Sequence, residues 1–394
     1  MTSRREALAI LFHRAETAGW AGADPYDGLH SLAGRLAIPL GPLARLFVIQ
    51  STLRWPTARS MVRPAPSVNP KGLALFLGAA IRSRAALGEA QARDRAMRLL
   101  HELRLRAVTV GTDLAWGYPF PWQSRFLWAP AGTPNAVVTS TVACHLLAAE
   151  EALGDRDAGE MARSAARFLL NHLCWSDADG GASSVSYTPL DRTQIVNVSG
   201  LAARLLARTG EKERAARLTR FIVRSQLENG GWPYSLSARG RWQDSFHTGF
   251  LLESLLDLRA MGIEVPESTL RRGFRAYARF FDERGGARLY AESSAPIDAH
   301  SAAQGMATYE AAVRCGAGPK LVGDDPTVVG ERVANEAMNR LWIEDKGRFA
   351  YRVSSAGVRD ELDYARWVQA WMAFGLASVE SISAGTSGAR TEVA

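Results

Sequence analysis

The sequence contains few cysteines, and their spacing shows no pairing. Cys144, Cys174 and Cys315 are the only cysteines among 394 residues, and each falls in a different apolar segment. Such a set provides neither a disulfide framework nor the paired cysteines of a structural zinc site. Unpaired thiols are typical of a reducing compartment. We therefore predict a cytoplasmic protein in which the three thiols are buried.

The sequence also lacks the motifs of common cofactor sites and long apolar runs. It has no glycine-rich phosphate loop and no His-Glu-x-x-His pair, so we expect neither a nucleotide cofactor nor a catalytic metal. No apolar run reaches the roughly 20 residues that cross a bilayer. The apolar stretch near the N-terminus is too short for the core of a signal peptide. We predict no membrane span.

Charge and composition favour a folded chain with a large core. The 47 Lys and Arg residues exceed the 40 Asp and Glu residues, giving a net charge of +7. The arginines are spread along the sequence rather than gathered in one run, which indicates solvated helix faces and no nucleic-acid partner. A hydrophobic content of 47% with only 17 prolines excludes a disordered chain.

One complete structural unit is visible between residues 212 and 258. An Arg-rich amphipathic segment, 212–226, ends at Asn229-Gly230-Gly231, where glycine permits the backbone conformation that stops a helix. An aromatic turn follows, and Asp244 offers a cap for an apolar helix that is buried on most sides. The unit is therefore an outer helix, an aromatic turn and an inner helix.

This unit recurs along the chain. The starts of the predicted inner helices are near Thr139, Asn197, His247, His300 and Tyr364. Amphipathic helices between these points predict an all-α fold, an α/α toroid of six or seven helical hairpins. We predict one domain over residues 1–377, with less regular closing hairpins in 1–60, and a disordered tail over 378–394. The first helix, 1–18, is expected to pair with the last inner helix.

In such a toroid every inner helix starts at the same end, so the residues before these starts surround one funnel. As catalytic candidates we take two acids, two histidines and a tyrosine: Asp191, Asp244, His247, His300 and Tyr187. As substrate-binding candidates we take Trp116, Tyr118, Trp122, Gln123, Arg125, Thr139, Asn197, Trp232, Tyr234, Asp298, Asp363, Arg366 and Trp367. Aromatic rings among carboxylates, amides and arginines fit a saccharide, because sugar rings stack on aromatics and hydroxyls need polar partners.

Several of these residues also have a structural interpretation. Asp244, Asp298 and Asp363 precede helix starts, where aspartate is a common cap. Trp232 fits a wedge between hairpins. The aromatic loop 113–134 either plugs the ring or lines its mouth.

The residues leave the reaction open. A glycoside hydrolase needs two carboxyl groups about 5–10 Å apart, for which Asp244 with Asp191 or Asp298 are candidates. A lyase or uronyl epimerase needs a base such as His247, His300 or Tyr187, with Arg125 or Arg366 facing the substrate carboxylate. A non-catalytic saccharide-binding or scaffold protein and a terpenoid cyclase-like toroid are the alternatives.

Two resemblances add to this interpretation. Gln226, Gly230 and Trp232 match the Gln-x-x-x-Gly-x-Trp repeat of squalene cyclases and protein prenyltransferases, which are α/α toroids. The chain lacks the acid motif of the cyclases and the zinc site of the transferases, so this resemblance implies fold only. The segments 116–125, 132–139, 186–191 and 242–250 resemble a family of bacterial exopolysaccharide biosynthesis proteins, related in architecture to six-hairpin glycosidases. That resemblance implies a saccharide or polysaccharide intermediate as substrate, with polysaccharide-assembly proteins as possible partners.

Overall fold

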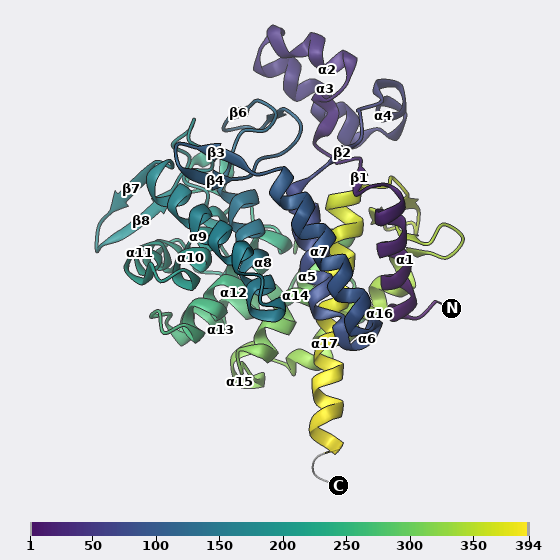
Figure 1. The fold of residues 1–394 in the computed structure, drawn as a ribbon, viewed down its shortest axis with the longest axis vertical. Helices are drawn as coiled ribbons and strands as arrows, with labels where there is room; N and C mark the ends of the chain where they lie inside the picture. Colours follow the sequence, from purple (N-terminus) through teal and green to yellow (C-terminus); the bar gives the residue numbers. More distant parts are fainter. Residues whose placement is uncertain (1, 392–394) are drawn as a thin grey trace.

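The most apolar helices form a closed inner ring. The computed structural model describes residues 2–391 (Figure 1). Each inner helix contacts the next along the chain, and the last contacts the first. The inner helices are α5 (Pro70–Arg82), α8 (Ala136–Leu153), α10 (Val196–Arg208), α12 (Ser245–Ala260), α14 (Ala299–Arg314) and α17 (Trp371–Thr391).

A second set of helices surrounds this ring. Each outer helix packs against an inner neighbour, and α1 packs against α17, so the first and last parts of the chain close the toroid as the sequence predicts. The outer helices are α1 (Arg4–Thr17), α7 (Glu89–Leu105), α9 (Arg156–Asn171), α11 (Lys212–Arg224), α13 (Glu267–Ala278) and α16 (Pro326–Leu341). Within residues 2–391 the prediction of an all-α toroid is confirmed, with six hairpins rather than seven.

Local chemistry explains where the inner helices begin. The side chains of Asn135, Asp244 and Asp298 each accept a hydrogen bond from the backbone N–H three residues later, which satisfies a donor that the helix leaves free. Gly154 ends α8 with a φ of 73°, a conformation that glycine adopts without strain. Four of the five predicted starts therefore agree with the structure to within three residues, and the fifth, Tyr364, precedes a π-helical turn, Ala365–Ala370, that leads into α17.

The two ends of the toroid differ. Connections from an inner to the next outer helix are short, and two of them carry only the short helices α6 (Arg84–Leu87) and α15 (Pro319–Val322). Connections from an outer to the next inner helix are long and carry every strand among the described residues. These are β1 (Ala21–Gly22), β2 (Ser67–Val68), β3 (Val108–Val110), β4 (Asp113–Ala115), β5 (Trp122–Gln123), β6 (Trp128–Ala129), β7 (Trp175–Ala178), β8 (Ala182–Val185), β9 (Ile297–Asp298), β10 (Trp342–Ile343), β11 (Arg348–Phe349), β12 (Arg352–Val353) and β13 (Arg359–Asp360). The end with the strands is called the upper end below, as in Figure 1.

One connection carries helices that stand apart from the ring. Between α1 and α5 the chain forms α2 (Leu32–Ala37), α3 (Pro42–Arg54) and α4 (Pro56–Val62), which extend beyond the toroid at the upper end (Figure 1). Residues 32–62 are called the projection. A buried ion pair between Arg59 and Asp27, 2.8 Å long, joins its base to the body, and α3 contacts β5. The helices predicted to close the ring in this region thus lie outside it, apart from α1.

Two segments bear on the predicted boundaries. α8 is long and apolar enough to cross a membrane by length and composition, yet about two thirds of it (67%) is buried inside the toroid, as for the core helix of a globular domain. α17 extends to Thr391, and its residues Val379 and Glu380 are buried. The packed helix therefore continues past residue 377, where the sequence predicts a disordered tail; residues 392–394 of that tail lie outside the described residues.

Candidate active site

A cavity of about 110 Å³ lies at the upper end, where the inner helices begin. Every inner helix, or the turn that precedes it, contributes at least one side chain to its wall, and the strand-bearing loops supply the remainder. The lining residues are Tyr26, Lys71, Tyr118, Phe120, Trp122, Val137, Tyr187, Asn197, Tyr234, Phe246, His247, Phe250, His300, Arg366 and Trp367. This is the upper cavity.

Half of the predicted site residues meet in the upper cavity. They come from five separate stretches of sequence and are brought together by the closure of the ring. These residues are Tyr118, Trp122, Tyr187, Asn197, Tyr234, His247, His300, Arg366 and Trp367. For these nine residues, the structure agrees with the prediction that residues near the starts of the inner helices surround one funnel.

His247 and Asp244 form a hydrogen-bonded pair at the start of α12. One carboxylate oxygen of Asp244 accepts from the backbone N–H of His247 at 3.0 Å, and the other lies 2.7 Å from the imidazole Nδ1. A carboxylate at that distance accepts a hydrogen bond, so Nδ1 carries a proton, and in the neutral form of the ring the lone pair is on Nε2. Asp244 thus caps the helix and also fixes the tautomer of a histidine that faces the cavity.

His300 lies in the same cavity without a polar partner. It is only 1% exposed, and neither ring nitrogen has a hydrogen-bond partner among the described residues. Its ring stacks on Phe246 at 4.4 Å between centroids and on Trp371 at 4.6 Å. Burial lowers the pKa of His300 well below its ordinary value, so the imidazole is neutral. An unsatisfied buried donor costs about 1–3 kcal/mol, which makes this ring a candidate for contact with a ligand.

Lys71 is a cavity residue that sequence reasoning missed. It starts α5, and its ammonium lies 5.1 Å from the ring centroid of Phe250 and 5.3 Å from that of Trp371, with no ion-pair partner in the described part of the chain. Burial, followed by the positive charge of Arg366, lowers the pKa of Lys71 to about 7. The sequence could have indicated this residue, because Lys71 follows the helix cap Asn69 by two residues, as His300 follows the cap Asp298.

Arg366 is already neutralised. It lies in a π-helical turn, Ala365–Ala370, that precedes α17, and π-turns are frequent at functional sites. Its guanidinium binds both carboxylate oxygens of Asp24, at 2.5 and 2.8 Å, and both residues are buried. Since the two charges compensate each other, Arg366 shapes the wall and offers little charge to a substrate carboxylate.

The aromatic wall is held by a tyrosine pair and by residues that sequence reasoning did not list. The hydroxyls of Tyr118 and Tyr187 are 3.2 Å apart. Burial raises the pKa of both, so neither phenol ionises near neutral pH. Phe246 and Phe250, which belong to the apolar run of α12, complete the wall. The sequence shows these two phenylalanines in an apolar run, but such a run on an inner helix is more typical of core packing than of a cavity wall.

Three predicted binding residues are structural instead. The indole N–H of Trp116 donates to the carbonyl of Leu103 at 2.9 Å, and the hydroxyl of Thr139 bonds both backbone groups of Trp116. The indole N–H of Trp232 donates to the carbonyl of Ile222 at 2.9 Å. All three are buried. Trp116 and Trp232 are therefore wedges between helices, because their indole N–H groups are bonded to backbone carbonyls inside the protein.

Two further predicted binding residues organise the loop around β5 and β6. The side-chain amide of Gln123 donates to the carbonyls of Ser124 and Leu127. The guanidinium of Arg125 lies 5.5 Å from the ring centroid of Trp242. Neither belongs to the wall of the upper cavity.

The other predicted acids are also engaged elsewhere. Asp191 accepts hydrogen bonds from backbone and hydroxyl groups of its own turn, including Thr188 at 2.7 Å. Asp298 caps α14 and pairs with Arg352 at 2.7 Å. Asp363 lies at the surface in an ion pair with Arg14. No carboxylate is among the described residues that line the upper cavity, so neither the predicted two-carboxylate hydrolase pair nor the single acid of a cyclase is assembled there.

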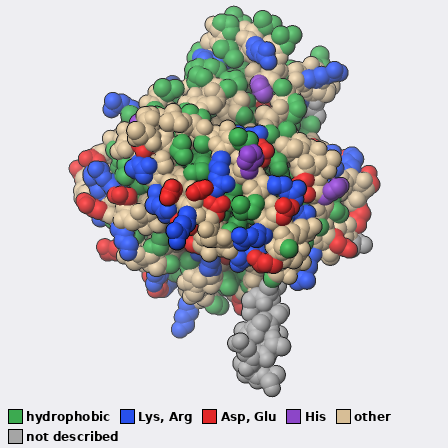
Figure 2. Space-filling view, viewed as in Figure 1, with side chains coloured by type: hydrophobic (Ala, Val, Ile, Leu, Met, Phe, Trp, Pro, Cys, Tyr) green, Lys and Arg blue, Asp and Glu red, His purple; other side chains and the backbone are tan. Residues whose placement is uncertain are grey.

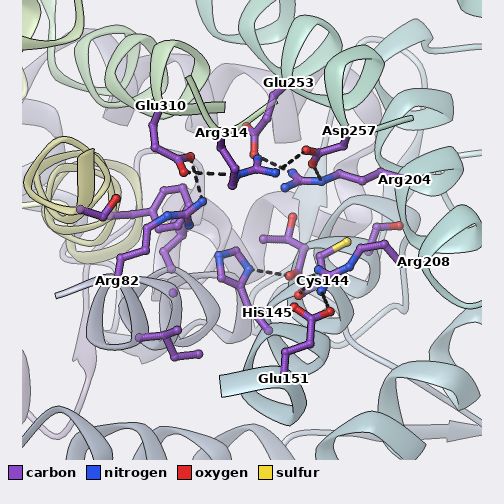
Figure 3. Close-up of a pocket in the computed structure, with 18 of the residues that line it drawn as sticks. Arg82, Cys144, His145, Glu151, Arg204, Arg208, Glu253, Asp257, Glu310 and Arg314 are labelled. Carbon is purple, nitrogen blue, oxygen red and sulfur yellow. Dashed lines mark hydrogen bonds and ion pairs between the residues drawn. The ribbon is translucent and has the colours of Figure 1, made fainter. Parts of the chain in front are cut away.

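A second, larger cavity of about 960 Å³ lies at the opposite end, among the later turns of the inner helices. Figure 3 shows that its charged side chains point toward one another across neighbouring helices. Arg204 pairs with Glu253 and Asp257, and Arg314 pairs with Asp257 and Glu310. These ion pairs link α10, α12 and α14 and leave little free charge for catalysis. His145 is half-buried there, and desolvation lowers its pKa to about 3.

Comparison with known proteins supports the architecture. No protein-family model matches the chain, and no curated protein matches its sequence. Solved structures do match. A cellobiose 2-epimerase from Bacillus thermoamylovorans is 11% identical, with a TM-score of 0.57, over 79% of this chain and 87% of that one. An α-mannanase from Bacteroides thetaiotaomicron is 12% identical, with a TM-score of 0.61, over 81% and 88%.

A third solved structure is that of a D-mannose isomerase. It is 12% identical, with a TM-score of 0.59, over 81% of this chain and 89% of that one. At these identities the likeness shows a shared six-hairpin toroid and no more. The resemblances to exopolysaccharide proteins and to squalene cyclases stay predictions.

Proposed function

We propose that the chain is a carbohydrate-active enzyme that transfers protons on a neutral sugar in the upper cavity, as an epimerase or isomerase does. The observation that carries this proposal is the meeting of two imidazoles, His247 and His300, in an aromatic cavity without a carboxylate in its wall. The structural neighbours named as cellobiose 2-epimerase and D-mannose isomerase act on sugars in the same architecture.

In the proposed reaction His247 is the base. Because Asp244 holds the proton on Nδ1, the free Nε2 takes a proton from the carbon next to the sugar carbonyl, and Asp244 stabilises the imidazolium that forms. The electron pair of the broken C–H bond makes an enediolate. His300, whose imidazole is neutral, donates a hydrogen bond to the developing oxyanion. Return of the proton from His247 to the neighbouring carbon completes an isomerisation, and uptake of a solvent proton by the original carbon on its opposite face completes an epimerisation. Neither reaction needs a redox partner.

The charges in the wall favour a neutral sugar over a uronate. Arg366 is occupied by Asp24, and the pKa of Lys71 is lowered to about 7. The remaining wall is largely aromatic, which suits the C–H faces of a pyranose ring. The cavity is smaller than the roughly 300–1,000 Å³ of most small-molecule sites. We therefore include in the proposal that the loop bearing Trp122 moves outward when a sugar enters.

The proposal for the pathway in which the enzyme acts depends on the sequence motifs of two loops. Segments 116–125 and 242–250 resemble exopolysaccharide biosynthesis proteins, and this resemblance supports a substrate that is a unit of a bacterial polysaccharide. A cytoplasmic location, inferred from the unpaired cysteines, belongs to the same proposal.

The test uses a panel of reducing mono- and disaccharides in heavy water. The purified chain should produce an epimer or ketose and incorporate deuterium at the carbon next to the carbonyl, measured by mass spectrometry and NMR. His247→Ala and Asp244→Asn should each lower turnover by about 100-fold or more, because general-base catalysis contributes about 10²–10⁴.

Matched controls separate chemistry from folding. His101→Ala removes an exposed histidine, and Asp325→Asn alters the cap of the outer helix α16; both should retain full turnover. Binding of sugars without deuterium uptake would contradict catalysis and favour a saccharide-binding protein. Hydrolysis of a glycoside that survives Asp244→Asn would contradict the assignment of the upper cavity.

A further inference from the structure

The projection exposes an unusual number of large apolar side chains. Of the fifteen large hydrophobic residues exposed in the described part of the chain, seven lie between residues 32 and 61. They are Leu32, Leu36, Leu40, Leu43, Phe47, Trp55 and Met61. The space-filling view shows green side chains beside blue ones at this end of the molecule (Figure 2). Apolar surface gathered in this way marks an interaction site.

The exposed face of α3 is opposite the face that packs. At about 100° per residue, Leu43 and Phe47 are only about 40° apart around the helix, whereas Ile49, which is buried, is about 160° further around from Phe47. Leu43 is 84% exposed and Phe47 is 68% exposed, while Ile49 and Thr52 face the body. α3 thus has apolar residues on two opposite faces, and the outer of these faces has no partner within the described chain.

The charge of the same segment has one sign. No Asp or Glu occurs between residues 28 and 88, and the projection with its link to α5 carries five arginines: Arg35, Arg45, Arg54, Arg59 and Arg63. Arg59 is paired with Asp27. Arg54 falls within about 20° of Leu43 around α3, so a cation sits on the apolar face itself. Apolar residues interleaved with arginines and free of acids are the composition of a helix that binds an anionic lipid surface.

We propose that the projection docks on the surface of an anionic lipid bilayer, with Leu40, Leu43 and Phe47 in the headgroup boundary and the exposed Arg35, Arg54 and Arg63 against lipid phosphates. The alternative occupant, a second copy of this chain on a two-fold axis, would bring two surfaces that carry arginines and no acids against each other. The projection stands beyond the ring at one end of the long axis (Figure 1), so the toroid does not block a flat surface.

Docking at this surface places the upper cavity near the bilayer. α3 contacts β5, and β5 carries Trp122, which lines the cavity. Arg45 stacks over the ring of Trp128 on the paired strand β6, at 4.2 Å from its centroid. The proposal itself rests only on the surface of the projection and does not depend on the reaction proposed for the cavity.

The experiment is vesicle co-sedimentation of the full chain. Two kinds of vesicle are compared, one of phosphatidylcholine with roughly 30% phosphatidylglycerol and one of phosphatidylcholine alone. Each is tested at about 0.05 and 0.5 M salt. Leu43→Ser/Phe47→Ser should weaken binding at least tenfold. Each change removes an apolar side chain whose full burial in the membrane would by itself raise the binding constant more than tenfold. Arg35→Gln/Arg54→Gln should weaken it about 30-fold at low salt, because each arginine near an anionic surface contributes about 1 kcal/mol.

The matched control is Leu190→Ser/Val358→Ser, which removes two exposed apolar residues outside the projection and should bind as the unaltered chain does. All six altered positions are exposed, so circular dichroism and melting should be the same for every variant. Binding to anionic vesicles that is lost only in the projection variants supports the proposal. Absence of vesicle binding, binding unaffected by either projection variant, or dimerisation abolished by Leu43→Ser/Phe47→Ser without vesicle binding would overturn it.

Discussion

Replacement of Lys71 by methionine should stabilise the protein near neutral pH and lose this advantage in alkali. Lys71 is buried, and its pKa falls from 10.5 to about 7 in the folded chain. Above pH 10.5 the amine is neutral in both states. As the pH falls from 10.5 to about 7, the unfolded chain takes up a proton that the folded chain does not, so the folded state loses stability. The difference of about 3.5 pH units corresponds to roughly 5 kcal/mol.

Urea unfolding followed by tryptophan fluorescence at pH 6.5, 8 and 9.5 measures this effect. The free energy of unfolding of Lys71→Met should exceed that of the unaltered chain most at pH 6.5, and the gap should shrink by about 1.4 kcal/mol per pH unit between pH 7 and 10. Lys320→Met, at an exposed lysine, should follow the unaltered chain at every pH. A gap that is constant with pH would refute the reasoning, because the amine would then not titrate differently in the two states.

Three other substitutions test the fold around the upper end. Gly117→Ala should lower the melting temperature and the turnover of any active sugar, since its Cβ would lie 2.2 Å from the carbonyl oxygen of Thr133. Arg59→Met should cost about 3–5 kcal/mol at pH 7 by leaving Asp27 unpaired. Burial raises the pKa of Asp27 to about 6, so that urea unfolding at pH 5 should show a smaller loss. Gly375→Ala should lower the melting temperature, because its Cβ would lie 2.9 Å from the backbone of α14.

Local sequence chemistry determined the helices and their order. Glycines that permit positive φ, side-chain caps within three residues and apolar periodicity act between near neighbours in the chain, so the sequence alone indicates them. This is why the inner-helix starts near Asp244 and Asp298, the α/α toroid and the funnel containing His247 and His300 could be predicted. The caps predicted for these two acids are confirmed, and Asp244 does more than cap.

Only the tertiary structure decided which funnel residues face a cavity and which fill the core. Trp232 and Tyr234 are two residues apart, yet one wedges between helices and the other lines the upper cavity. Arg366 is neutralised by Asp24, which is 342 residues away in the chain. Pairing across such a distance depends on closure of the ring. Burial of Lys71 depends on the same closure, because side chains from other hairpins, such as Phe250 and Trp371, exclude water from its ammonium. The sequence around Lys71 does not show that these side chains lie next to it.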